Sequence, residues 1–150
     1  METAAFLLSQ LGAHASSQFL ARAAELDLTG PHVGVLRAIA DDPGTSQQAL
    51  AQRLDILPSR VVAFVDDLED RGLVRRERHP SDRRSHALRL TPTGEQVREQ
   101  LRVLGAEHND RLLAPLSERE RVTLTELLAK VAAAQGLRPG VHPGFRHLGR

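Results

Sequence analysis

The chain of 150 residues contains no cysteine, no tryptophan and no tyrosine, and only four phenylalanines. Without thiols it cannot form disulfides, thiolate metal sites or a cysteine-based oxidation switch. The shortage of aromatic rings argues against a stacking platform for single-stranded nucleic acid. No apolar run reaches the roughly 18 residues that a membrane-spanning helix needs. Duplex DNA is therefore a better candidate partner than single-stranded nucleic acid or a membrane.

The composition is that of an ordinary globular protein, with 41% hydrophobic and 26% charged residues. A chain of this length is expected to form one domain with its own core. Its amino-terminal stretch, METAAFLLSQLGAH, has an early acidic residue and no basic leader, so we expect no signal peptide and a cytoplasmic location. The basic residues are 19 arginines and one lysine. This bias suits bidentate contacts to phosphate or guanine, or it reflects only a GC-rich genome.

The most informative stretch runs from 57 to 91. Pro58 suits the first turn of a helix, because its missing N–H would be unpaired there in any case. Val61, Val65 and Leu68 then follow at i, i+4 and i+7, which predicts one buried stripe. Gly72 suits the left-handed position after a helix and predicts an end at about Arg71. The other face carries Ser59, Arg60, Ala63 and Asp67.

The residues after this helix predict a β-hairpin. Residues 73–78 can form one strand, and 86–90 form a second in which His86, Leu88 and Leu90 alternate with Ala87 and Arg89. The segment 79–85 between them is polar and contains turn formers. Two capping patterns complete the region: Thr45 with Gln48 opens a short helix ending at about Leu54, and Thr91-Pro92 opens the helix after the hairpin.

The hairpin and its approach are strongly basic. Between residues 71 and 89 there are seven arginines and only two acidic residues, Glu77 and Asp82. This is a local excess of five positive charges in a chain whose net charge is +1. The seven are Arg71, Arg75, Arg76, Arg78, Arg83, Arg84 and Arg89. An arginine-rich loop is often only a solvated face. Here a helix with small polar residues directly precedes it, which indicates a recognition helix and a wing that bind phosphate-bearing DNA.

Two runs, LEDRGLV at 68–74 and DRRSHALRLTPTG at 82–94, resemble the MarR family of winged helix-turn-helix transcriptional regulators. The likeness covers 29–94 in motif detail and extends to about Gln135 in helix order. It implies a mainly α protein with a small β wing (α+β), in which a winged helix-turn-helix lobe joins a helical dimerisation region of an obligate-type homodimer. We assign 29–91 to the lobe, 3–26 and 92–135 to dimerisation, and 137–150 to a tail of a single 1–150 domain.

The helices predicted at the two ends of the chain support this organisation. A helix over 3–26 has a broad apolar face, and a Ser117–Glu120 capping box opens a last helix that ends near Gly136. These ends carry more apolar surface than the small lobe needs, and the resemblance implies that they form a dimer interface; the alternative is one larger helical monomer. The tail is not helical by composition. It is either a loose end or a segment that packs over the dimer or touches DNA through Arg138, Arg146 or Arg150.

Candidate DNA contacts follow from position and from the resemblance. Ser59, Arg60 and Ala63 lie on the exposed face of the recognition helix, and arginine can bond guanine bidentately; Arg60 could instead pair with a carboxylate. Gln47 and Gln48 begin the preceding helix, where backbone N–H groups favour phosphate. The wing candidates are Arg78, Asp82, Arg83 and Arg84. The family pattern implies that Arg84 enters the minor groove while Asp82 holds an arginine in place, with Arg83 as the competitor.

The resemblance also implies an effector. Relatives bind aromatic, often phenolic, carboxylates or lipophilic compounds in a crevice between the dimer helices and the lobe. The candidate lining residues are Leu11, His14, Phe19, His32 and Leu36. An imidazole among apolar groups could meet an anionic or phenolic head. The alternative is that each is plain core or interface.

Enzymatic and metal chemistry find little support in the sequence. It lacks a glycine-flanked nucleophile, a phosphate-binding loop and an HExxH pattern. Seven histidines are present, but His79, His86, His142 and His147 lack the spacing of a zinc site. We therefore expect no enzyme activity, cofactor or metal.

The sequence thus predicts a sequence-specific regulator that binds double-stranded DNA, a repressor released from a pseudo-palindromic operator by an aromatic or lipophilic small molecule. The alternatives are a regulator without an effector, a metal-responsive one, an activator with the same body, and a module whose basic hairpin binds an acidic protein.

Overall fold

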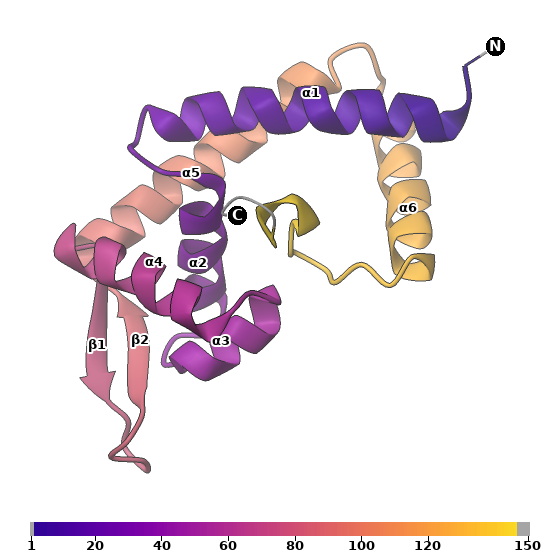
Figure 1. Cartoon of the computed structure of the whole chain (residues 1–150). Coiled ribbons are helices and arrows are strands. Elements are labelled where there is room, and N and C mark those ends of the chain that lie inside the picture. Colours follow the sequence, from indigo (N-terminus) through magenta and orange to yellow (C-terminus); the bar gives the residue numbers. More distant parts are fainter. Residues whose placement is uncertain (1, 147–150) are drawn as a thin grey trace.

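The computed structural model describes residues 2–146, which form six α-helices, a two-stranded antiparallel sheet and a short 3-10 turn. Figure 1 shows a lobe built from the middle of the chain, with a hairpin projecting from one end and long helices at the other. No helix of this part of the chain is long and apolar enough to cross a bilayer. The elements are α1 Ala4–Ala24, α2 Gly30–Asp41, α3 Gln47–Leu54, α4 Pro58–Asp70, β1 Val74–Arg78, β2 His86–Leu90, α5 Pro92–Leu112, α6 Glu118–Ala134 and the turn Pro143–Arg146.

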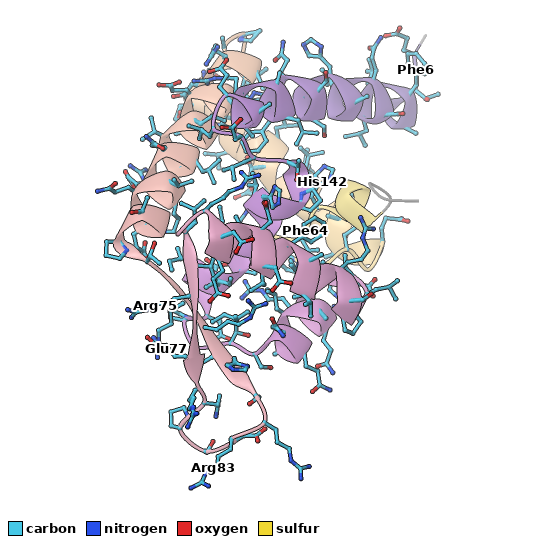
Figure 2. All side chains as sticks on the ribbon, turned by 60° about the vertical axis from the view of Figure 1, so that its left-hand side comes forward. Phe6, Phe64, Arg75, Glu77, Arg83 and His142 are labelled. Carbon is cyan, nitrogen blue, oxygen red and sulfur yellow. The ribbon has the colours of Figure 1, made fainter. Side chains whose placement is uncertain are left out.

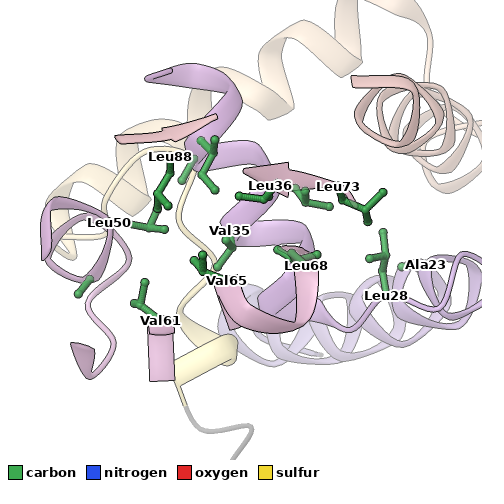
Figure 3. Packing of buried hydrophobic residues seen from close by; sticks show 14 residues of the cluster. Ala23, Leu28, Val35, Leu36, Leu50, Val61, Val65, Leu68, Leu73 and Leu88 are labelled. Atoms are coloured by element: carbon green, nitrogen blue, oxygen red, sulfur yellow. The ribbon is translucent and has the colours of Figure 1, made fainter. Parts of the chain in front are cut away.

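The core lies where α2, α3, α4 and the hairpin meet (Figure 3). The stripe predicted on α4 is confirmed, because Val61, Val65 and Leu68 are completely buried. They pack in one cluster with Leu36 of α2 and Leu50 of α3. Burying side chains of this size stabilises the fold by about 1.5–3 kcal/mol each before entropy is counted, so α4 is firmly held along one face.

Several local signals are confirmed. Pro58 begins α4, and Gly72 adopts a left-handed φ of +69° directly after it. Thr29 is the N-cap residue of α2, and the hydroxyl of Thr91 accepts the Gly94 N–H at the start of α5. The capping box of Ser117 and Glu120 opens α6 as predicted.

The capping box predicted at Thr45 and Gln48 is wrong. Ser46 is the N-cap of α3, and its hydroxyl accepts the N–H of Ala49 at 3.1 Å. Thr45 is buried beside β2, where its carbonyl accepts the Leu88 N–H at 2.9 Å. Pairing with the strand therefore displaces the start of the helix by one residue.

The strict alternation predicted for the second strand is also wrong, since Ala87 and Leu88 are both buried. This strand contacts α2, α3 and α5, so its middle is covered on both faces. The register pairs Val74 with Leu90 and Arg78 with His86, which leaves 79–85 as the tip. Figure 1 shows this tip pointing away from the body.

The start of α5 is fixed to the base of the hairpin. The N–H of Thr91 donates to the Leu73 carbonyl at 3.0 Å, and its hydroxyl donates to the Gly72 carbonyl at 2.6 Å. Gly94 follows one turn later, so close to the strand that an added Cβ would lie 1.9 Å from the Leu73 oxygen. Only glycine fits this contact. The hairpin and α5 therefore have one relative position.

The two ends of the chain leave apolar faces uncovered. In Figure 1, α6 stands apart from the lobe and the amino-terminal half of α1 extends beyond it. In the part of the chain that the structure describes, no residue of α6 is buried. The exposed side chains are Phe6, Leu7, Leu8 and Leu11 of α1 and Val122, Leu127, Leu128 and Val131 of α6. Apolar faces of this extent indicate a partner surface.

Candidate DNA-binding interface

Near its amino end, the exposed face of α4 carries small side chains. Ser59 and Ala63 are exposed, as predicted for a recognition helix. Val62 lies between them and is 37% exposed, although it is apolar. The spacing rule that identified the buried stripe places 59 and 63 opposite that stripe and Val62 at the edge of this exposed face. A small face can approach base edges closely, and a valine can contact the methyl group of thymine.

Arg60 sits on the flank of this face. Its guanidinium carbon lies 5.7 Å from the centre of the Phe64 ring, one turn further along α4. The edge of Phe64 in turn meets the ring of His32 at 5.5 Å. The cation is thereby positioned near the start of α4 by an aromatic face. The predicted guanine contact requires such a positioned, partly exposed arginine.

Arg76 lies at the centre of a network of ion pairs and hydrogen bonds in the lobe. Its Nη2 lies 2.5 Å from Oδ1 of Asp66, and its Nη1 donates to Oε2 of Glu69. Gln47 Oε1 accepts from both Nε, at 3.0 Å, and Nη2, at 2.8 Å. Burial disfavours the charge, but the hydrogen bonds to Asp66 and Glu69 outweigh it and raise the pKa of Arg76. One guanidinium therefore connects α3, α4 and β1.

Ion pairs within the chain reduce the number of arginines in this region that are available to bind DNA. Of the seven arginines, four pair within the chain: Arg76 as above, Arg71 with Asp67 at 3.0 Å, and Arg75 and Arg89 with the same Glu77 at 2.9 and 3.0 Å. Figure 2 shows Arg75 and Glu77 side by side on the hairpin. The others, Arg78, Arg83 and Arg84, are exposed and form no ion pair within residues 2–146. The unpaired positive charge is thus concentrated at the end of the wing.

Local hydrogen bonds shape the tip of the wing. Oδ1 of Asp82 accepts the backbone N–H of Arg84 at 2.9 Å, and the His79 N–H donates to the Ser85 carbonyl at 3.2 Å. Asp82 therefore holds an arginine through its backbone, whereas the sequence reading left open how it would do so. Arg83 points away from the body in Figure 2. Both tip arginines are exposed, so either side chain is free to enter a groove.

The predicted phosphate contacts on α3 differ from each other. Gln48 is exposed at the start of the helix. The side-chain oxygen of Gln47 accepts from Arg76, while its amide N–H₂ group remains the donor that a phosphate contact needs. The sequence alone could not reveal this, because the two residues are 29 positions apart.

A cavity of about 410 Å³ lies on the opposite side of the lobe from the wing tip. Its apolar lining includes Phe19 and Leu20 of α1, Val33 of α2, Leu54 and Ile56 at the end of α3, and Val141 of the tail. Its polar lining includes Ser16, Arg37, His108 and His142. No carboxylate pairs with Arg37 in the described part of the chain, so this cation is available to an anion. Burial lowers the pKa of His108, with Arg111 and Arg22 acting in the same direction.

Comparison with known proteins gives the family. The MarR family profile matches residues 26–85. A candidate transcriptional regulatory protein for the hcr operon of Thauera aromatica is 39% identical over 65% of this chain and 59% of that protein, so the match spans less than two thirds of it. The transcriptional regulator HosA of Escherichia coli O111:H- is 35% identical over 72% of this chain and 80% of its own length. The chain belongs to the MarR family.

The solved structures of this family agree with the fold. The transcriptional repressor CouR bound to a 23-mer DNA duplex is 37% identical and gives a TM-score of 0.75 over 87% of this chain and 92% of that one. The predicted winged helix-turn-helix class, mainly α with a small β wing, is confirmed. MarR family members are transcriptional regulators and not enzymes, as the sequence indicated.

The five residues predicted to bind an effector do not line one common site. Phe19 lines the cavity. Leu36 is completely buried in the core, and Leu11 and His14 are exposed on α1. His32 joins α2 to α4: its Nδ1 accepts the Thr29 N–H at 3.2 Å, and its Nε2 lies 3.0 Å from Oδ2 of Asp67. Burial lowers the pKa of His32, which suits a neutral structural histidine.

The residues that sequence reasoning missed come from distant segments. Arg37 faces the cavity from α2, His108 from α5, and Val141 and His142 from the tail. No local pattern marks them, because the path of the tail depends on tertiary contacts. The sequence predicts a tail that is a loose end or that packs over the dimer or touches DNA; instead, residues 138–142 contact the lobe of the same chain. His147, Arg150 and the side chain of Arg146 lie outside the described residues.

Proposed function

We propose that this MarR family chain is a homodimeric transcriptional repressor that binds a pseudo-palindromic duplex operator and is released by a small aromatic or lipophilic ligand. The observation that carries the DNA-binding part is the pairing pattern of the arginines. Arg76 is used internally to fix the lobe, whereas Arg83 and Arg84 are left exposed at a shaped tip. Such a tip fits a minor groove, where a narrow channel concentrates negative potential.

The second contact is α4 in the major groove. Its exposed Ser59, Val62 and Ala63 present little bulk, so the helix can lie close to the base edges, and Arg60 provides a guanine-binding group beside them. Exposed Gln48 begins α3 and can bind a flanking phosphate. In this arrangement α4 reads sequence, while α3 and the wing position the lobe.

We expect Arg84→Ala to weaken operator binding by about 1–3 kcal/mol, because it removes one positioned cation from the groove. Its side chain is exposed and makes no ion pair within the described residues, so the melting temperature should stay unchanged. The measurement is fluorescence anisotropy with the chain's own upstream DNA and a scrambled duplex, each at two salt concentrations.

Lys130→Ala on α6 is the charge-matched control and should leave affinity unchanged. Equal, weak binding to both duplexes would contradict sequence-specific DNA recognition and favour an acidic protein partner for the wing. Equal affinity of the wild-type protein and the Arg84 variant would contradict the role given to this arginine.

Dimerisation rests on the uncovered apolar faces of α1 and α6. On α6, Leu124, Leu127, Leu128 and Val131 follow at i, i+3, i+4 and i+7, and Leu127 is 56% exposed. In a two-fold dimer these faces would cover each other and set the two α4 helices about 34 Å apart, one turn of DNA. Homodimers are typical of the family.

We expect Leu127→Glu to convert the dimer to a monomer, because burying a carboxylate in an apolar interface without a partner is unfavourable. Ala129→Glu adds the same charge on the opposite face of α6 and should leave the dimer intact. Analytical ultracentrifugation distinguishes the two. A monomeric wild-type protein, or a Leu127→Glu variant that remains fully dimeric, would exclude this interface.

The cavity supports the effector part of the proposal. Apolar walls with one unpaired cation, Arg37, match an aromatic ring that carries a carboxylate. A ligand changes DNA affinity only if it binds the free dimer and the DNA-bound dimer unequally. We propose that occupancy favours a dimer whose α4 helices are wrongly spaced for the operator. Among the described residues, no group of three or more His, Cys, Asp or Glu side chains could hold a metal ion.

We expect 2-naphthoate, used as a probe, to raise the operator Kd by a factor of about 5–150, the usual size of such coupling. Neutral 2-naphthylmethanol is the control ligand, and Arg37→Gln is the control variant. Each removes the pair between the ligand carboxylate and the Arg37 guanidinium, so each should show a smaller rise in the operator Kd. Equal binding of 2-naphthoate to free and DNA-bound dimer would refute the release mechanism.

A further inference from the structure

The segment after α6 returns to the lobe and caps the carboxyl-terminal end of α3. In Figure 1 the chain leaves α6 and runs back toward α2. There Nη1 of Arg138 donates to the carbonyl of Gln52 and, at 3.3 Å, to that of Arg53. These carbonyls belong to the last turn of α3 and have no partner within their own helix. A guanidinium at this negative end caps the helix from outside.

The same segment then forms a wall of the cavity. Gly140 packs against Arg37, since a Cβ added to it would lie 3.4 Å from Nη2 of that guanidinium. Val141 and His142 line the cavity, and Nε2 of His142 lies 3.4 Å from the hydroxyl oxygen of Ser16 on α1. Figure 2 places His142 below α1, on the far side of the lobe from Arg83. One short segment therefore contacts α1, α2 and α3.

We propose that residues 137–142 are a strap that belongs to the effector site and transmits its occupancy to α3. This inference rests on the effector part of the proposed function. Only Pro139 and Gly140 lie between Arg138 and Val141, and an extended chain spans at most about 3.6 Å per residue. So short a connection cannot absorb a large displacement at the cavity. A ligand that moves Val141 and His142 must therefore pull on Arg138 or break its bonds to α3.

The strap reaches the DNA-binding elements through α3. Arg53 also donates from its side chain to Asp41 at 2.7 Å, so the end of α3 is joined to α2 as well as to the strap. At the other end of the helix, Gln47 accepts from Arg76. Movement of this eight-residue helix thus bears directly on the contacts that position α4 and the wing. Val141 and His142 also contact any ligand in the cavity, which makes them specificity-determining residues.

Hydrogen–deuterium exchange on the full-length protein tests the strap without any ligand. In Arg138→Ala, amides of 52–56 and 137–142 should exchange about tenfold faster, because charge-assisted bonds that hold both segments are lost. Arg138→Lys keeps a donor and should give an intermediate rate, and Lys130→Ala should match wild type. Unchanged exchange at 52–56 in Arg138→Ala would overturn the proposal.

Adding 2-naphthoate tests whether occupancy of the cavity is transmitted to α3. In wild type it should alter exchange at α1, at 137–142 and at 47–56. In Arg138→Ala the response of α1 should remain and that of 47–56 should disappear. An identical response at 47–56 in both proteins, or protection of α1 and α2 without 137–142, would overturn the strap and leave the effector cavity in place. If 2-naphthoate protects neither α1 nor α2, the effector proposal fails and transmission fails with it, while the ligand-free rates still decide whether Arg138 caps α3.

Discussion

The arrangement of the DNA-binding lobe depends on one partly enclosed cation. The side chain of Arg76 is 18% exposed and is neutralised by Asp66 and Glu69 of α4, while Gln47 of α3 occupies two more of its N–H groups. Removing one partner of an enclosed charge network is costly, because the remaining charges lose their compensation. The network therefore joins α3, α4 and β1, so a shift of any one of them changes how the recognition face and the wing are presented to DNA.

The lobe connects to the helical ends through equally specific contacts. Thr91 and Gly94 join the start of α5 to Leu73 at the base of the hairpin, and the strap joins the end of α6 to α3 through Arg138. Two routes thus link the proposed dimer region to the DNA-binding elements, and the second of them lines the cavity. A change in dimer geometry or cavity occupancy would reach α3 and the wing without a flexible linker to absorb it.

The sequence predicted what depends on neighbouring residues. The buried stripe of α4, the end at Gly72 and the capping box at Ser117 follow from local spacing, and all are confirmed. It failed where a distant segment changed the local outcome. Thr45 does not cap α3, because β2 pairs with its backbone. Of the residues that line the cavity, Phe19 was predicted from the sequence, but Arg37 and Val141 could not be, because they come together only after the tail has folded back.

The most direct test of this account is a double-mutant cycle between Arg76→Gln and Arg84→Ala in operator affinity at fixed salt. The two residues make no contact with each other among the contacts of the described residues, so any coupling must act through the position of the wing. The account predicts that Arg84→Ala costs less in the Arg76→Gln background, with a coupling energy of about 0.5–3 kcal/mol. Costs that add to within about 0.5 kcal/mol would show that the wing is positioned without Arg76 and would contradict it.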